Sequence, residues 1–182
     1  TAFNVLRFAI LCNLRLSNAL SLKWNQVDME KQTLFFSASE MKRQANGNFT
    51  VYLSSQAVEL LRAQKRLGKT VQNELTGCYV FFSKDPSQHY SLTLIEQIMK
   101  KICREHEFYD PHESARLGRR VLPTVHGTAR ASFLTWVEAT GKDRRAAERN
   151  LHHKTETAVG ASYNREGYAL IRRKLSQDWG NF

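Results

Sequence analysis

The chain has 182 residues, 27 Lys and Arg against 17 Asp and Glu, and a formal net charge of +10 at pH 7, with a pI near 9.8. A hydrophobic fraction of 42% with only 3 Pro and 9 Gly excludes a disordered or collagen-like chain, and the length suits one domain with its own core. No apolar run approaches the ~20 residues that a membrane-spanning helix needs, so we expect no membrane partner. The excess of positive charge favours a polyanionic partner, most often a nucleic acid.

The cysteines and the first residues indicate the setting of the chain. Cys12, Cys78 and Cys103 are odd in number and form no Cys-x-x-Cys pair, which favours a reducing, intracellular compartment over a disulfide framework. The sequence opens with Thr1-Ala2-Phe3, already inside a helical pattern and without the pattern of a signal peptide. We therefore interpret the chain as a piece of a longer intracellular protein.

Helical periodicity dominates the first residues. Apolar residues recur three or four positions apart at Phe3, Leu6, Ile10 and Leu14, which predicts a buried helix over residues 2–13. Ser17 is a favourable N-cap residue, and it predicts a second short helix that ends near Trp24.

The pattern then changes to that of a β-hairpin. Residues 32–36 and 48–53 are rich in β-branched and aromatic side chains, and Asn46-Gly47 between them is typical of a tight turn. The sequence therefore predicts two antiparallel strands, with Lys42 and Arg43 near the mobile end of the hairpin.

The middle of the chain returns to helices. Ser54-Ser55 favour the start of a helix that ends at Gly68, residues 79–82 are typical of a short third strand, and Ser91 begins a strongly amphipathic helix. Residues 107–122 have the polar composition of a loop.

Three further helices are expected in the last third. One follows Pro123-Thr124 and ends at Gly141, a second runs from Asp143 to about Leu151, and a basic amphipathic helix covers residues 168–179 within a tail of residues 164–182. The predicted fold class is α+β, mainly α-helical, with one small antiparallel sheet.

Common enzymatic motifs are absent. The sequence has no GxGxxG, GxxxxGK[ST], HExxH or GxSxG, and neither His106-Glu107 nor His112-Glu113 has a second histidine at the spacing of a zinc site. Since no cluster of carboxylates suits Mg²⁺, an enzyme acting on phosphates would have to neutralise charge with Arg, Lys and His alone. We expect no cofactor and no metal.

The C-terminal half contains residues of that kind. His126 and Arg130 lie four residues apart at the start of a helix, where backbone N–H groups and the helix dipole favour an anion. Spacing alone equally suits a surface cap and a solvated charge. A single Tyr163 before a basic tail is most often a residue of a core or an interface.

Five segments of the chain carry such residues in one order. They are residues 11–24 (LCNLRLSNALSLKW, with Arg15), Met41-Lys42 ahead of Val51-Tyr52-Leu53-Ser54, His126-Gly127 through Phe133, Leu151-His152-His153-Lys154, and Ala161-Ser162-Tyr163-Asn164-Arg165. The first resembles the motif L-T-G-x-R-x-S-E-x-x-x-L-x-W, the fourth resembles L-G-H, and the fifth resembles A-x-Y-x-R. Together they resemble the catalytic domain of the tyrosine recombinases (the phage integrase family), above all the integrases of temperate phages and genomic islands.

The resemblance implies a mechanism that needs neither metal nor ATP. The implied catalytic residues are Arg15, Lys42, His126, Arg130, His153 and Tyr163. Tyr163 would attack a DNA phosphate to form a 3′-phosphotyrosine, the two arginines would stabilise the phosphorane, and Lys42 would protonate the leaving oxygen. His126 would help to take the tyrosine proton, and His153 would donate a hydrogen bond to a phosphoryl oxygen.

Further basic residues are candidates for contacts with the DNA backbone, with a solvated basic face as the alternative. They are Arg43, Arg116, Arg119, Arg120 and Lys154.

The chain departs from the family pattern in three ways. The family box reads H-x-x-R, whereas Arg130 follows His126 by four residues and Ala129 occupies the usual arginine position. Cys12-Asn13 and Asn18 stand where the family has Thr-Gly and Glu. The N-terminal DNA-binding domains of the family are absent, so we expect residues 1–182 to form a single catalytic domain.

The resemblance also implies partners and a location. The expected activity is site-specific DNA recombination and integration, including viral genome integration, on double-stranded attachment sites in the bacterial cytoplasm, associated with the nucleoid. A homotetramer on DNA is expected, with the last helix packed on a neighbouring protomer and with accessory directionality or DNA-bending proteins. The isolated fragment would instead be a monomer with that helix folded back. Two alternatives remain, a type IB topoisomerase-like enzyme and a non-catalytic DNA-binding or regulatory module.

Overall fold

The computed structural model of the chain describes residues 2–71, 75, 77–153 and 165–182, and within them only the backbone of residues 70–71, 125–127 and 165–167. Its α-helices (α), 3-10 helices (η) and strands (β) are, in chain order, α1 (Ala2–Leu11), α2 (Leu16–Leu20), η1 (Trp24–Gln26), β1 (Val27–Asp28), β2 (Thr33–Phe36), η2 (Ala38–Glu40), η3 (Gln44–Asn46), β3 (Phe49–Tyr52), α3 (Ser55–Val71), α4 (Leu92–Glu105), α5 (Pro111–Leu117), α6 (Val125–Ala139), α7 (Arg144–Asn150) and α8 (Arg165–Asn181). This mainly helical fold with a small antiparallel sheet confirms the predicted class.

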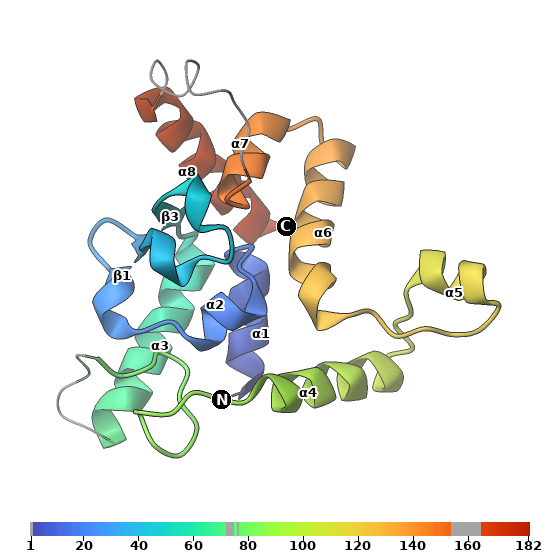
Figure 1. Cartoon of the computed structure of the whole chain (residues 1–182), viewed down its shortest axis with the longest axis horizontal. Coiled ribbons are helices and arrows are strands. Elements are labelled where there is room, and N and C mark those ends of the chain that lie inside the picture. The colour runs from blue at the N-terminus through green and yellow to red at the C-terminus, as the bar shows by residue number, and fades with distance from the viewer. Residues whose placement is uncertain (1, 72–74, 76, 154–164) are drawn as a thin grey trace.

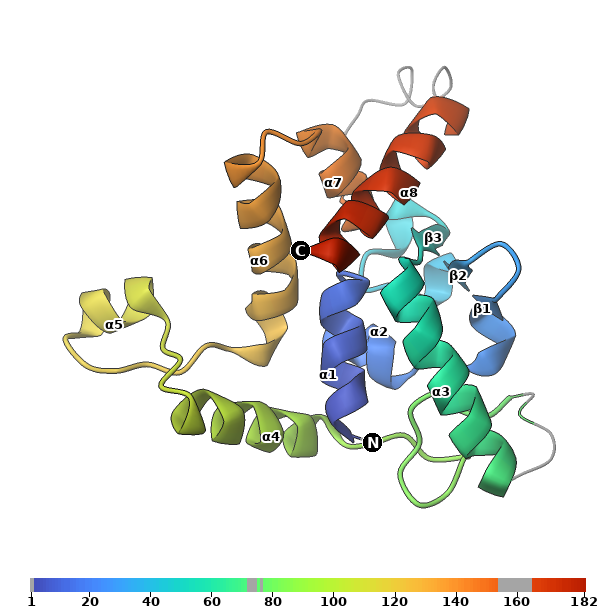
Figure 2. The same ribbon diagram turned by 180° about the vertical axis from the view of Figure 1, so that it is seen from behind.

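Helix α1 is the element around which the other helices pack. It contacts α2, α3, α4, α6 and α8, and Figures 1 and 2 show it near the middle of the molecule, with α4 and α5 extending to one side. Val5 and Phe8 are fully buried, as the helical periodicity predicts. The described residues include no helix long and apolar enough to cross a membrane.

The sheet confirms the predicted hairpin and adds a strand to it. The strand order is β1-β2-β3, and Leu34 pairs with Val51 and Phe36 with Phe49 in antiparallel register. Leu34 and Phe36 are buried whereas Phe35 is exposed, which is the alternation of a sheet with one face on the core. The two-residue β1 was not predicted.

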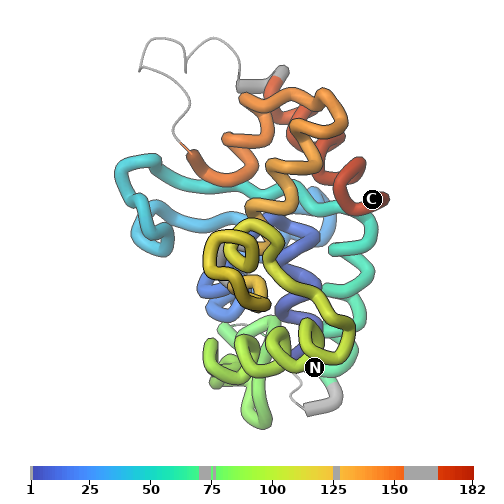
Figure 3. The backbone as a smooth tube through the Cα atoms, turned by 90° about the vertical axis from the view of Figure 1, so that its right-hand side faces the viewer, coloured from blue at the N-terminus to red at the C-terminus, as the bar shows by residue number. Residues whose placement is uncertain are grey.

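The connection between β2 and β3 is much longer than a tight turn. Residues 37–48, which we call the lysine loop, contain η2 and η3 and project from the body of the molecule (Figure 3). Lys42 lies between the two 3-10 helices and is exposed. Gly47 adopts φ +76° directly after η3, so this residue ends a helical turn and Asn46-Gly47 do not form the predicted two-residue hairpin turn.

Two of the predicted helix boundaries are wrong. Ser17 lies inside α2, whose N-cap is Arg15, because burial of Leu16 draws the helix start toward the core. Helix α3 continues past Gly68 to Val71. A Cβ atom at Gly68 would lie 2.9 Å from Cδ2 of Leu75, so this glycine permits a close approach and does not end the helix.

Two predictions for the middle of the chain are also wrong. Residues 79–82 form no strand but only isolated bridges, through Tyr79 and Phe82, since this segment packs into the core without a neighbouring strand. Residues 107–122 contain helix α5, whose N-cap Asp110 accepts a hydrogen bond from the backbone of Glu113 at 3.0 Å. The Asp-Pro pair at its start is a helix-start signal that the loop prediction overlooked.

Helix α8 packs on its own domain in this single chain. It contacts α1, α3, α7 and β3. The indole N–H of Trp179 donates to the carbonyl of Ile10 at 2.8 Å, and Lys142 pairs with Asp178 at 2.7 Å. The sequence favoured packing on a neighbouring protomer, whereas the structure shows the folded-back arrangement. The reason is the aromatic cluster that Trp179 forms with Phe133 and Trp136 of α6.

This cluster predicts that α8 contributes strongly to stability. Replacing Trp179 with Ala should lower the free energy of unfolding by about 3–5 kcal/mol, because a buried aromatic side chain and its hydrogen bond are lost. On the same helix, Leu170 is 72% exposed, so Leu170→Ala should change stability by no more than about 0.5 kcal/mol. Urea unfolding followed by circular dichroism compares the two variants, and equal losses would contradict the assignment of α8 to the core.

Candidate active site

Arg130 of α6 links the ends of two other helices. Its Nη1 atom donates to the carbonyl of Asn13, just after α1, at 3.2 Å, and Nη2 donates to the carbonyl of Leu151, the C-cap of α7, at 2.6 Å. Nη2 also lies 2.9 Å from Nε2 of His153. A guanidinium suits this place because the carbonyls that end a helix carry partial negative charge. Arg130 thus joins segments from three parts of the chain.

The electrostatics around Arg130 favour an anion. Burial and the neighbouring charge of Arg15 lower the pKa of Arg130 to about 10, Glu148 acts in the opposite direction, and Arg43 lowers it further. Burial and Arg43 also lower the pKa of Arg15. At neutral pH Arg130 stays charged, so three guanidinium groups act on one another with Glu148 as the acidic group that offsets them. An arriving phosphate would relieve this repulsion.

The turn before Arg15 depends on Asn13. Asn13 is buried and adopts φ +55°, in the left-handed region that Gly and Asn tolerate best. The chain therefore reverses after α1, and Arg15 takes an extended conformation as the N-cap of α2. Asn13 replaces the family glycine with a residue that can keep the same turn.

Glu148 of α7 orients the ring of His153. Its Oε2 atom contacts Nδ1 of His153, and its Oε1 atom accepts from Nε of Arg144 at 3.1 Å. Burial acts to raise the pKa of Glu148, but the hydrogen bonds from His153 and Arg144 outweigh it and hold the pKa below its ordinary value. Since a carboxylate only accepts, Nδ1 of His153 carries a proton, and Nε2 of the neutral ring accepts from Arg130.

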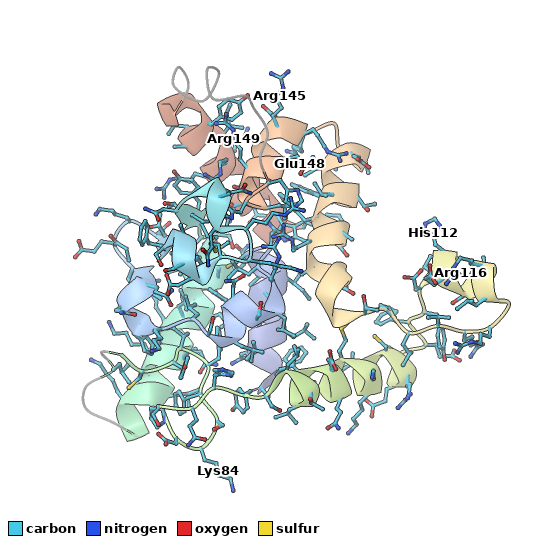
Figure 4. All side chains as sticks on the ribbon, viewed as in Figure 1. Lys84, His112, Arg116, Arg145, Glu148 and Arg149 are labelled. Atoms are coloured by element: carbon cyan, nitrogen blue, oxygen red, sulfur yellow. The ribbon has the colours of Figure 1, made fainter. Side chains whose placement is uncertain are left out.

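Figure 4 shows how α7 presents its polar side chains. Glu148 lies on the side of α7 next to α6, whereas Arg145 points away from the molecule. Glu148 is a site residue that the sequence analysis missed. It lies five residues before His153, and only the end of α7 at Asn150 brings the two side chains together.

The lysine loop contributes exposed charges near this cluster. Arg43 is close enough to lower the pKa of both Arg15 and Arg130. Lys42, its neighbour, is exposed and lies on the same loop. The structure therefore brings together Arg15, Arg43, Arg130 and His153 from the residues selected in the sequence, with Lys42 on the adjoining loop.

Other selected residues lie elsewhere or outside the described part. Arg116 pairs with Glu113 at 2.6 Å and Arg120 with Glu107 at 3.3 Å, and Figure 4 shows Arg116 on α5, far from Glu148. Arg119, between α5 and α6, is exposed.

The remaining selected residues are not described in full. The backbone of His126 belongs to the first turn of α6, but its side chain lies outside the described residues, as do Lys154 and Tyr163 entirely. No group of three or more His, Cys, Asp or Glu side chains that could hold a metal ion occurs in the part of the chain that the structure describes.

Comparison with known families gives this geometry its context. Residues 2–169 match the family model described as "Phage integrase family". The chain belongs to the phage integrase family. No match to this integrase-family chain was found among curated protein sequences.

Solved structures of recombinases share the fold. The integrase from mycobacterium phage Brujita aligns over 100% of this chain and 52% of its own, with 15% sequence identity and a TM-score of 0.65. The XerA recombinase aligns over 94% of this chain and 62% of its own, with 16% identity and a TM-score of 0.58. The Tn1549 transposon integrase in complex with transposon right end DNA aligns over 92% and 58%, with 15% identity and a TM-score of 0.59. The integrase-family chain thus spans little more than half the length of these proteins.

The turn at Asn13 generates a prediction. Asn13→Gly should keep the left-handed turn without strain, whereas Asn13→Ala should be about 1–2 kcal/mol less stable than the glycine variant. At Lys100, on the exposed side of α4, the order should reverse, since Ala is favoured over Gly inside a helix by about 1 kcal/mol. Urea unfolding of the four variants makes the comparison, and an alanine variant at position 13 as stable as the glycine variant would contradict the role of the turn.

Proposed function

We propose that the protein carrying this chain is a site-specific DNA recombinase that cleaves and rejoins DNA through a 3′-phosphotyrosine on Tyr163. The observation that carries the proposal is the convergence of Arg15, Arg130 and His153 into one positively charged cluster. Phosphoryl transfer without a metal needs such a cluster, because the charge of the transition state must be balanced by protein groups alone. Membership of the phage integrase family supports the same activity.

The two arginines would bind the scissile phosphate. Arg130 is held by backbone carbonyls, which fix its position while leaving its charge without a carboxylate partner of its own. Arg15, half-buried beside it, adds a second guanidinium. Guanidinium groups donate two parallel hydrogen bonds to phosphate oxygens, a geometry that an ammonium group lacks.

His153 would donate to a phosphoryl oxygen once DNA is bound. In the free protein its Nε2 atom faces Nη2 of Arg130. When a phosphate takes the donors of Arg130, Nε2 becomes available, and the carboxylate of Glu148 on Nδ1 stabilises the protonated ring. Glu148 is therefore a positioning residue for His153.

The proton transfers are assigned to two further residues. His126, one turn before Arg130 on α6, would take the proton of the Tyr163 hydroxyl as the phenolate attacks. Lys42 would donate a proton to the 5′-oxygen as it leaves. These assignments rest on the motif positions together with the place of Lys42 on the loop beside the arginines.

The complete protein would act on paired double-stranded attachment sites as a homotetramer in the bacterial nucleoid, with accessory directionality or DNA-bending proteins. Arg43, Arg116, Arg119, Arg120 and Lys154 would contact the DNA backbone. The neighbouring Tn1549 integrase structures contain DNA, which supports DNA as the partner. A type IB topoisomerase-like activity would release strands without exchanging them, and a non-catalytic module would form no covalent adduct.

The first test concerns the nucleophile. Full-length protein incubated with a nicked suicide attachment site should form a covalent protein–DNA adduct, and Tyr163→Phe should abolish it. DNA affinity should remain nearly unchanged, because one hydroxyl is lost from an interface dominated by phosphate contacts. Denaturing gels measure the adduct, and filter binding measures affinity. Adduct formation by the phenylalanine variant would show that another residue, with Tyr168 next in the sequence, is the nucleophile.

The second test separates the acid from the charge stabilisers. Lys42→Ala should slow cleavage of an ordinary site by roughly 100-fold, because a 5′-alkoxide needs a proton to leave. A site with sulfur as the bridging 5′ atom has a leaving group that needs no proton, so Lys42→Ala should cleave it at close to the wild-type rate. Arg130→Ala should remain slow on both substrates, since it acts on the phosphorane. Equal slowing of Lys42→Ala on both substrates would make Lys42 a phosphate ligand only.

A further inference from the structure

His152 fastens the lysine loop to the end of α7. The His152 ring is 7% exposed, and its Nε2 atom lies 3.1 Å from the carbonyl of Gly47. The carbonyl of His152 accepts from Nδ2 of Asn46 at 2.8 Å. The ring also packs on Phe49, with 4.7 Å between centroids. Three consecutive contacts along the loop and the start of β3 therefore converge on one residue.

The protonation state of His152 fits this contact. A carbonyl oxygen only accepts, so Nε2 carries the proton, and Nδ1 is buried with no hydrogen-bond partner among the described residues. Burial lowers the pKa of His152, and the charges of Arg15 and Arg130 lower it further against the opposing hydrogen bonds of the loop. The ring is therefore held neutral, and its one N–H is used on the loop.

The backbone of His152 is in an unfavourable conformation. It adopts φ +55°, and the family motif has glycine at this position, where a side chain brings strain. Neither Asn46 nor Gly47 has another contact of this kind with α7 on the page of described interactions, so the side chain of His152 is what a glycine would leave out.

The other end of the lysine loop is fastened separately. Asn18 of α2 donates through Nδ2 to the carbonyl of Glu40 at 3.2 Å and lies 3.9 Å from Sδ of Met41. The two anchors leave Lys42 and Arg43 exposed between them. One anchor lies three residues after Arg15, and the other directly precedes His153.

We propose that His152 is a positioning residue that holds the lysine loop against the α7 end, so that Lys42 is kept close to the scissile phosphate bound by Arg15, Arg130 and His153. The proposal rests on the proposed function for the role of Lys42, but the contact itself can be tested without DNA. The family glycine would leave this end of the loop without the ring contacts, and the loop would spend more time away from the site.

The first experiment measures the loop in the chain without DNA. In His152→Gly, which suits the left-handed backbone, the amides of Asn46 and Gly47 should exchange with deuterium roughly tenfold faster than in the wild type, because their turn opens more often. His152→Asn, which also tolerates this backbone, provides a second variant, and Asn46→Ala removes the reciprocal bond. The matched control is Gln32→Gly, a residue with φ +53° in an exposed turn away from the loop. Exchange in the loop that is unchanged in His152→Gly and His152→Asn would overturn the proposal.

The second experiment reads the effect on proton donation in the full-length protein. His152→Gly should cleave an ordinary attachment site about tenfold more slowly than the wild type, and the sulfur-bridged site at close to the wild-type rate, as expected when a general acid is misplaced. Equal slowing on both substrates would overturn the positioning role. Lys42→Ala is assayed beside it. If Lys42→Ala shows no rescue by sulfur, the assignment of Lys42 fails, whereas the exchange measurement still decides whether His152 holds the loop.

Discussion

The candidate site depends on a guanidinium that is held by carbonyls and by no carboxylate. Arg130 donates to the carbonyl of Asn13 after α1 and to that of Leu151 at the end of α7. Neutral acceptors fix the position of the group without cancelling its charge, and the carbonyl ends of the two helices stabilise a cation there. An ion pair would have made the same link at the expense of the charge that a phosphate must meet. The partial burial of Arg130 is therefore compatible with function only because these two helix ends meet at α6.

Two left-handed residues make this meeting possible. Asn13 and His152 both adopt φ +55°, and each reverses the chain directly after a helix, two residues before Arg15 in one case and immediately before His153 in the other. Family motifs have glycine at both places. Asn is tolerated in this conformation because its side chain is short and polar, whereas the histidine is stabilised by its contacts with Gly47 and Phe49. The same device thus places an arginine and a histidine, with different compensation at each position.

The last helix adds a second layer of constraint. Arg172 of α8 is buried, and this burial lowers its pKa to about 10. It donates to Oδ1 of Asn150 at 2.7 Å and to the carbonyl of Thr50 at 2.6 Å, so it joins the end of α7 to β3. The aromatic cluster around Trp179 fastens the other end of α8 to α1 and α6. Since α8 follows the segment that contains Tyr163, these contacts fix where that segment must return to the core.

The sequence by itself determined the helices, the hairpin and the order of the motif segments, because periodicity and caps report local burial and local hydrogen bonding. Ser91 and Asp143 do cap α4 and α7 as predicted. Only the tertiary structure decided that Gly68 lies within a helix and that Glu148 orients His153. It also decided that Arg130 ends on the carbonyl of Asn13, 117 residues away, and that Asn46 bonds to His152 across 106 residues. Such contacts depend on how buried faces pack together, and no local pattern encodes a distance between residues so far apart along the chain.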